Sequence, residues 1–286
     1  MTIALQLAAF GVVQGAFLLL ASLGFSLTRR VEGFLNIAHA QYLAISAFVT
    51  LYLNNIVGLH FAIASIAAVV VTCAVALLVA RTVFDPIRRF GPAIALITSV
   101  GVVYMLEGVI HAVVGTGTSL LTLPNVPAIS LGPVNVTFYQ AMVVLLAVVA
   151  TVATALVLNH TRMGTAIRIT ALDRELGASR GVDVDRASIA SWLLSSFLAA
   201  LGGIALSLLG SLTADKGFDQ ILIILAVALL AGIGSIWSLA ASAFLIGIAR
   251  ELSLLWLPGG YRDIIAFGFV IVVLVFLPRG ISGQSE

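Results

Sequence analysis

Long apolar stretches without charge alternate with short polar connectors along this 286-residue chain. A helix needs roughly 20 residues, at about 1.5 Å each, to cross the apolar core of a bilayer. Backbone polar groups must pair internally in lipid, so such stretches predict helices. They are Ile3–Thr28, Ile37–Leu53, Phe61–Ala80, Pro92–Val114 (interrupted by Glu107), Phe138–Leu158, Ala187–Ala214, Ile221–Ala249 and Ile264–Leu277. The pattern predicts an all-α integral membrane protein, a single domain over residues 1–286 with about eight transmembrane segments.

The last two stretches predict an irregular segment. Ile221–Ala249 is long for one crossing and Ile264–Leu277 is short. Gly232 and Gly234 are candidates to break the longer stretch into two pieces, giving a broken or re-entrant helix. Such breaks are tolerated where the backbone lines a cavity or is buried against protein. Other small residues, including Gly203 and Gly247, predict close helix packing.

Composition agrees with lipid as the solvent. Hydrophobic residues make up 61% of the chain and charged residues 9%, with a mean hydropathy of +1.19, whereas soluble domains carry about 25% charged residues. The net charge of +2 is too small to indicate a nucleic-acid partner, and the lone Cys73 excludes a disulfide framework. Residues 1–10 lack a basic targeting region, so we interpret the first stretch as a retained helix.

The arginines predict the orientation. Ten of the 14 Lys and Arg residues lie in three connectors, 29–36, 81–91 and 160–186, whereas connectors 54–60 and 115–137 have no charged residue. Alternating crossings place the three basic connectors on one face, which the positive-inside rule makes cytoplasmic. The amino terminus is then outside. A break at Gly232 and Gly234 returns the carboxyl terminus to the cytoplasm.

The connector at residues 161–186 is the longest charged stretch. Met163, Ile167, Thr170 and Leu172 or Arg174 recur at near-helical spacing, Gly181 fits a C′ glycine, and Asp183 or Asp185 fits the cap of the next helix. We therefore expect a short amphipathic helix, a tight turn and then a membrane helix. A connector whose arginines merely fix orientation would need only a few residues. We expect this one to be a docking element for a cytoplasmic partner.

Intrinsic catalysis is not expected. Lys216 is the only lysine, and it does not follow a glycine-rich loop, so the chain has no G-x-x-x-x-G-K-[ST] motif to cradle ATP. No spacing of His, Cys, Asp or Glu indicates a metal centre. The chain is therefore predicted to be no enzyme and to hold no metal or other cofactor.

Polar side chains inside membrane segments are costly, and each needs a reason. Asn36, His39 and Gln41 open the second stretch, either as a kinked entrance to a transport path or as a structural set in which Asn36 caps the helix and His39 donates to a carbonyl. Glu107 lies inside a crossing, where it can remain protonated, pair with His39 or His111, or face a wet cavity. All four are candidates for a translocation path.

Several motifs together resemble one known family. Asn36–Gln41 is similar to an Asn-x-Ala-His-Gly element, Arg81–Pro86 with Ala95–Thr98 to an Arg-Pro-Leu loop and its following helix start, and Thr161–Arg186 to a cytoplasmic coupling loop. The segments 231–235, 261–263 and 278–280 fit the carboxyl-terminal pattern of the same family. Over its whole length the chain resembles the permeases of branched-chain amino acid ABC importers, specifically the smaller of the two paired permease types.

The resemblance implies partners and roles. It implies a multi-pass protein of the bacterial plasma (inner) membrane, a second homologous permease, two ABC ATPase subunits that use ATP and Mg, and an extracytoplasmic solute-binding protein. The residues that it places in ATPase coupling are Arg168, Asp173, Arg174, Glu175, Ala178 and Gly181. Two residues depart from the family pattern. Ala40 replaces a usual glycine, and Glu107 stands where an uncharged Gln is common.

Other functions remain open at this stage. Urea and short-amide permeases are close relatives, so the solute is a branched-chain or related small amino acid or one of these alternatives. A self-sufficient secondary transporter or channel would use Glu107 and His39 as a relay. It would leave the long ordered connector at 161–186 without a role. A membrane enzyme is disfavoured because no nucleophile, metal or acid–base cluster is visible.

Overall fold

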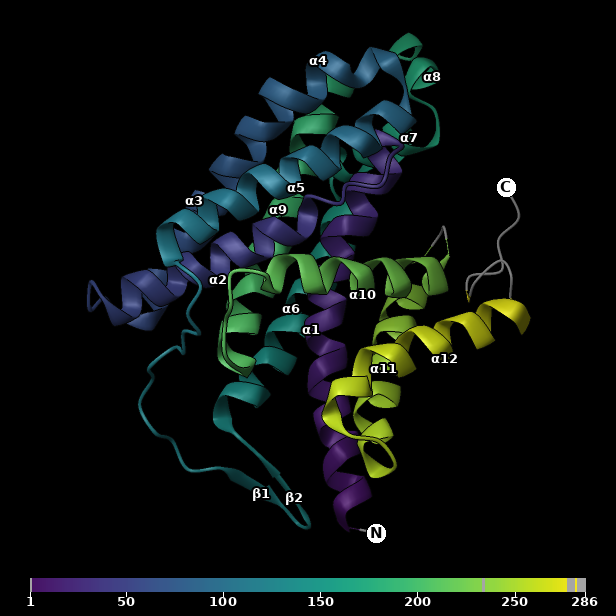
Figure 1. The fold of residues 1–286 in the computed structure, drawn as a ribbon. Coiled ribbons are helices and arrows are strands. Elements are labelled where there is room, and N and C mark those ends of the chain that lie inside the picture. The colour runs from purple at the N-terminus through teal and green to yellow at the C-terminus, as the bar shows by residue number, and fades with distance from the viewer. Residues whose placement is uncertain (1, 233–234, 277–280, 282–286) are drawn as a thin grey trace.

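The computed structural model describes residues 2–232, 235–276 and 281, and its regular structure is almost all helical (Figure 1). The longer helices are α1 (Thr2–Glu32), α2 (His39–Asn55), α3 (Phe61–Val79), α5 (Pro92–Val114), α6 (Phe138–His160), α9 (Val184–Leu209), α10 (Lys216–Ala231), α11 (Ile236–Leu252) and α12 (Arg262–Phe276). Short helices are α4 (Asp85–Ile87), α7 (Arg162–Leu172) and α8 (Arg174–Ser179). Single turns lie at Ala80–Phe84, Arg88–Phe90, Ser253–Leu255 and Gly259–Tyr261.

The predicted count of about eight spanning segments is not confirmed. Over the described residues, six helices are long and apolar enough to cross a membrane. They are Thr2–Glu32, Phe61–Phe90, Pro92–Val114, Phe138–His160, Val184–Leu209 and Ile236–Leu255. The helices α2, α10 and α12 have 17, 16 and 15 residues. At about 1.5 Å per residue even α2 extends only about 26 Å, less than a bilayer core of roughly 30 Å.

The long stretch at 221–249 is two helices. The first, α10, ends at Ala231, and Gly232 follows with φ 74°, a conformation that glycine adopts without strain. The second, α11, begins after Ser235, whose hydroxyl accepts a hydrogen bond from the Trp237 amide. Gly234, the other candidate for the break, lies outside the described residues. The helix α10 lies across α1, and α11 runs along it (Figure 1).

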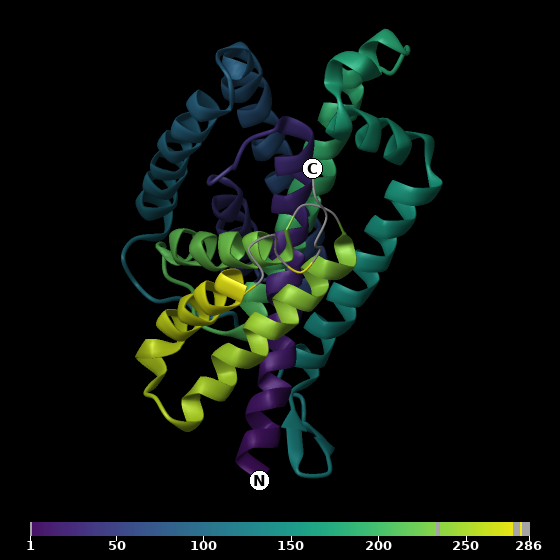
Figure 2. The same cartoon turned by 90° about the vertical axis from the view of Figure 1, so that its right-hand side faces the viewer.

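The central helix of the fold is α1. It packs against α9, α11, α6 and α10, and Figure 2 shows it between the side formed by α3 and α5 and the side formed by α6. Its middle, from Ala16 to Phe25, is almost completely buried. Side chains on the outer helices, such as Ile66, Ile97 and Leu145, are exposed and apolar, as expected for residues in contact with lipid or another subunit.

At two positions, neighbouring helices approach so closely that only glycine fits. A Cβ at Gly247 of α11 would lie 2.4 Å from the Gly15 nitrogen and 2.6 Å from the Gly11 oxygen of α1. A Cβ at Gly203 of α9 would lie 2.1 Å from the Leu43 oxygen of α2. No larger residue fits at these contacts, so the predicted close packing at Gly203 and Gly247 is confirmed.

The connector between α5 and α6 carries a β-hairpin, which the all-α prediction did not include. Strand β1 (Ile129–Leu131) pairs antiparallel with β2 (Val134–Val136) through a turn in which Gly132 has φ 64°. The Asn135 backbone and the Gln6 side chain exchange two hydrogen bonds of 2.8 Å, which join the hairpin to the start of α1. Alternating β-branched residues around a Gly-Pro turn favour this local structure over helix.

Candidate functional site

The coupling segment, defined here as residues 161–183, connects α6 to α9 at the end of the molecule opposite the N terminus (Figures 1 and 2). The sequence predicted one helix, and this is wrong: the segment holds two, α7 and α8. The chain turns at Asp173, whose carboxylate accepts a 2.8 Å hydrogen bond from the Leu176 amide and caps α8. Gly181 follows α8 with φ 82°, which confirms it as the C′ glycine.

Apolar packing and caps hold this segment to the membrane helices. Ile167 is 2% exposed and packs with Leu27 of α1, Leu158 of α6 and Ala187 of α9. A Cβ at Gly164 would lie 2.1 Å from the Val157 oxygen, so α7 and α6 meet at a corner that admits only glycine. The segment is therefore a rigid extension of three helices and not a solvated loop.

The opposite face of the segment is exposed. Among the residues predicted to contact an ATPase, Arg168, Asp173, Glu175, Ala178 and Gly181 are exposed, whereas Arg174 is half-buried and pairs with Asp185. The most exposed large side chain is Leu172, at 88%, and Leu176 is 55% exposed. Leu172 ends α7 and Leu176 lies in the first turn of α8, so both exposed leucines are close to the joint between these helices.

The sequence grouped Leu172 or Arg174 with Ile167 and Thr170 on one repeating helical face, and for Leu172 this is wrong. Leu172 follows the buried Thr170 by two residues, which turns it about 200° around the helix from the buried face. Leu172 therefore takes no part in the core of the segment and is available to contact another protein.

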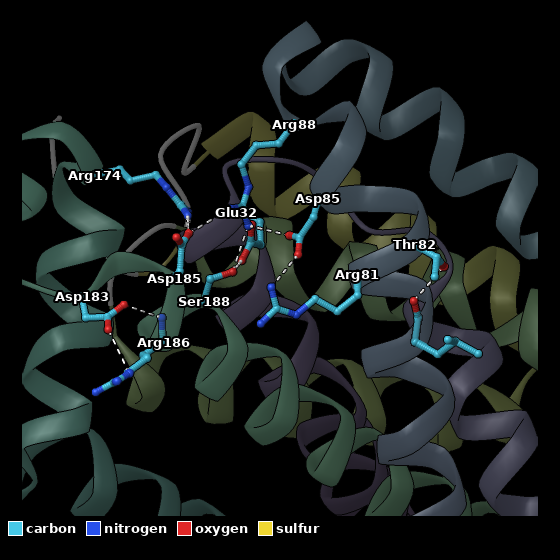
Figure 3. A network of polar contacts seen from close by, with 11 residues as sticks. Glu32, Arg81, Thr82, Asp85, Arg88, Arg174, Asp183, Asp185, Arg186 and Ser188 are labelled. Carbon is cyan, nitrogen blue, oxygen red and sulfur yellow. Dashed lines mark hydrogen bonds and ion pairs between the residues drawn. The ribbon is translucent and has the colours of Figure 1, made fainter.

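A network of charges connects the coupling segment to the membrane helices (Figure 3). The Arg174 guanidinium of α8 lies 3.2 Å from the Asp185 carboxylate in the first turn of α9. Arg88, in the turn before α5, lies 4.0 Å from the same Asp185 oxygen and donates to Ser188 Oγ at 2.9 Å. The turn before α5, the start of α9 and the second coupling helix therefore share one set of charges.

The network ends on Glu32 at the last residue of α1. Its side chain is 3% exposed, and it accepts hydrogen bonds from the Arg88 guanidinium and the Ser188 hydroxyl. A second carboxylate, Asp85, lies 3.4 Å from Arg88. A buried carboxylate is stable in such a place because charged and polar donors surround it. The sequence did not reveal this network, because Glu32 lies 56 residues from Arg88 and 156 from Ser188.

His39 contacts a backbone carbonyl, as the structural alternative predicted. Its ring is fully buried between α1 and α9, with Nε2 3.0 Å from the Ala21 carbonyl oxygen. A carbonyl can only accept, so Nε2 carries the hydrogen. On the same seam the Thr28 hydroxyl donates to Ser195 Oγ at 2.6 Å, and Ser195 donates to the Gly24 carbonyl. These contacts join α2, α1 and α9.

Asn36 and Gln41 lie close to His39 in the chain, but their side chains differ from His39 in forming no hydrogen bond to a described residue. Asn36 was expected as a possible cap of α2, but its side chain forms no cap, and its backbone carbonyl accepts from the His39 amide instead. The side-chain amides of Asn36 and Gln41 are fully buried without a hydrogen-bond partner among the described residues. Gln41 faces the first turn of α10, where a Cβ at Gly217 would lie 2.5 Å from its oxygen.

Glu107 does not meet His39. It gathers instead with His111, one turn further along α5, and with Asp215, which immediately precedes α10. The His111 Nε2 atom lies 2.9 Å from Asp215 Oδ1. His111 and Asp215 are 104 residues apart in the chain, so sequence analysis did not bring them together.

Comparison with known proteins agrees with the motifs. Residues 7–274 match the family model described as branched-chain amino acid transport system / permease component. The high-affinity branched-chain amino acid transport system permease protein LivH of Escherichia coli K12 is 26% identical over 290 residues, covering 96% of this chain and 94% of LivH. The corresponding protein BraD of Pseudomonas aeruginosa is 24% identical with the same coverage. No solved structure matches the chain. The chain therefore belongs to the permease components of branched-chain amino acid transport systems.

Proposed function

We propose that this chain is the membrane-spanning permease subunit of an ATP-driven importer for branched-chain or related small amino acids. One observation carries the proposal: a rigid coupling segment presents an exposed Leu172 outward and is joined through Arg174 to the ends of the membrane helices. Family membership and the printed function of LivH and BraD support the choice of solute. Solute would arrive from an extracytoplasmic binding protein.

The chain would work as part of a complex in the bacterial plasma membrane. A second homologous permease would complete the path, and two ABC ATPase subunits would bind and hydrolyse ATP with Mg. The coupling segment and the connector with Arg88 would lie in the cytoplasm with the carboxyl terminus, and the amino terminus would lie outside. This orientation follows the positive-inside rule, because the basic connectors share one face.

A movement of the ATPase would displace the coupling segment, and the charge network would transmit this displacement to the membrane helices. An ATPase that moves Leu172 displaces α7 and α8, which Ile167 and Gly164 hold against α1 and α6. The Arg174–Asp185 pair transmits the displacement to α9, and Arg88 transmits it to Glu32 on α1. A rigid element with ionic contacts to several helices can bias their arrangement in this way.

Asn36 and Gln41 are the residues of this chain that we assign to the solute path. Each is a buried amide without a hydrogen-bond partner in the part of the chain that the structure describes, and an unsatisfied buried polar group costs about 1–3 kcal/mol. A passing zwitterion offers these amides both donors and acceptors. The break at Gly232 would let α10 shift against α2 while α11 stays packed on α1.

Uptake into proteoliposomes tests the proposal. Vesicles would contain this chain with its permease partner, with or without the ATPases, with ATP inside and the binding protein outside. We expect labelled leucine to accumulate only when both ATPase and ATP are present, and an excess of urea not to compete. Leucine uptake by this chain alone would favour the secondary transporter or channel. Competition by urea or a short amide, without competition by valine or isoleucine, would favour the amide permeases.

A further inference from the structure

Three metal-ligating side chains meet at the end of α5 remote from the coupling segment. Glu107 and His111 are spaced i, i+4 on α5, which places them on one helix face. Asp215 comes from the linker between α9 and α10. One ligand atom from each residue lies within 4.8 Å of the other two, and His111 Nε2 lies 2.9 Å from Asp215 Oδ1. Side chains from two separate elements therefore converge on one point.

The backbone around this point holds the donors in place. Ser119, just beyond α5, and Leu212, in the linker, exchange two backbone hydrogen bonds of 2.9 and 2.8 Å. This bridge fixes the linker three residues before Asp215 against the chain leaving α5. Tyr104 of α5 also stacks on Phe218 of α10, with ring centroids 6.4 Å apart. The convergence is thus supported on both sides by contacts that do not involve the ligating groups.

Contacts with other described residues do not account for the Glu107 carboxylate inside α5. No hydrogen bond or ion pair joins its half-buried carboxylate to a described residue, although it lies on an apolar helix. A carboxylate in such a segment is costly unless a cation or a donor compensates it. The donor set of one imidazole and two carboxylates suits zinc and similar ions, which take three protein ligands and leave one position open. Calcium and magnesium prefer six or more oxygen ligands.

We infer that Glu107, His111 and Asp215 form a binding site for a divalent transition-metal ion, best suited to Zn²⁺. The ion would take the place of the direct contact between His111 Nε2 and Asp215 Oδ1 and would supply the missing partner of Glu107. Because its ligands come from α5 and from the residue before α10, it would join these two elements. The site would therefore restrain α10 at its first residue, at the end opposite the break at Gly232.

Zinc binding to the full chain in lipid nanodiscs tests this inference. Competition with a chromogenic chelator would measure stoichiometry and affinity. We expect about one Zn²⁺ per chain, with affinity at least about tenfold weaker in Asp215→Asn and in Glu107→Gln, and weaker still in His111→Ala. The matched controls are Asp219→Asn, an exposed acid one turn into α10, and His160→Ala, an exposed histidine at the other end of the molecule. Both controls should bind as the wild type does.

Thermal unfolding in the same nanodiscs provides a second readout. At one zinc concentration, zinc should raise the midpoint of the wild type and of Asp219→Asn by the same amount, and it should raise the midpoint of Asp215→Asn clearly less. Absence of saturable zinc binding to the wild type would overturn the inference. Equal zinc affinity in the wild type, Asp215→Asn and Glu107→Gln would overturn it as well. These two side chains are partly exposed, so their isosteric variants are expected to fold even if His111→Ala does not.

Discussion

Arg174 Nη2 lies 3.2 Å from Asp185 Oδ1, so an ion pair joins the second coupling helix to the first turn of α9. The Asp185 side chain is 77% exposed, and exposed pairs contribute only about 0.2–1 kcal/mol to stability. The pair therefore matters for the position of α8 relative to α9 more than for folding. Arg174 differs in this respect from the other predicted coupling residues, which face outward.

Replacement of Asp185 should uncouple the transporter without unfolding it. In Asp185→Asn, Arg174 loses its charged partner, and Arg88 loses one of two nearby carboxylates outside α1. Solute transported per ATP hydrolysed should fall, by at most about fivefold for a pair of this strength, with an unchanged melting midpoint. The control is Arg186→Ala, which removes an exposed pair with Asp183 that lies outside the network. Equal transport per ATP in the two variants would rule out the assigned role of Asp185.

Replacement of Glu32 should affect stability instead. Glu32→Gln removes a buried charge that accepts from Arg88 and Ser188. Arg88 is about one-third exposed and keeps Asp85, so we expect a loss of about 1–2 kcal/mol in the free energy of unfolding. Denaturant unfolding in detergent measures it. Arg81→Ala, which breaks an exposed i, i+4 pair with Asp85, should cost no more than about 0.5 kcal/mol. A loss from Glu32→Gln no larger than this control would contradict the assigned burial.

The glycine contact between α1 and α11 should tolerate no side chain. Gly247→Ala would place a methyl group against the backbone at Gly11 and Gly15, and overpacking of this kind costs about 1–3 kcal/mol. Gly108→Ala, in the middle of α5 with open space around it, should be neutral or stabilise by up to about 1 kcal/mol. Thermal unfolding of both variants in the same detergent compares them. A Gly247→Ala protein as stable as Gly108→Ala would show that the helices lie further apart.

Local patterns predicted much of the fold. The apolar stretches 61–80, 92–114 and 138–158 differ from α3, α5 and α6 by no more than two residues at either end, because lipid demands continuous helices and the connectors begin with polar or glycine residues. The break at Gly232 also has a local cause, since glycine adopts a positive φ without strain. The kink at Asp173 was missed because aspartate was read as a charge on one helix rather than as the cap of a second.

The candidate sites depend on contacts that no local pattern contains. Glu32 meets Arg88, and His111 meets Asp215, because helices distant in the sequence end at the same point. The spacing of charged residues along the chain does not predict such contacts between distant segments. Sequence analysis singled out residues 161–186 from their length and charge, but it assigned Leu172 to the same helical face as Ile167, whereas the folded segment exposes Leu172.

The central claim is that the coupling segment receives the ATPase at Leu172, and site-directed photocross-linking tests it most directly. Cys73 is the single cysteine of this chain, so a Cys73→Ser variant of the chain has no other thiol. A photoreactive maleimide on Leu172→Cys in the assembled complex should yield an adduct with the ATPase subunit. The control is Leu120→Cys, which is 62% exposed in the connector after α5 and should yield no such adduct. An ATPase adduct from Leu120→Cys, with none from Leu172→Cys, would contradict the account.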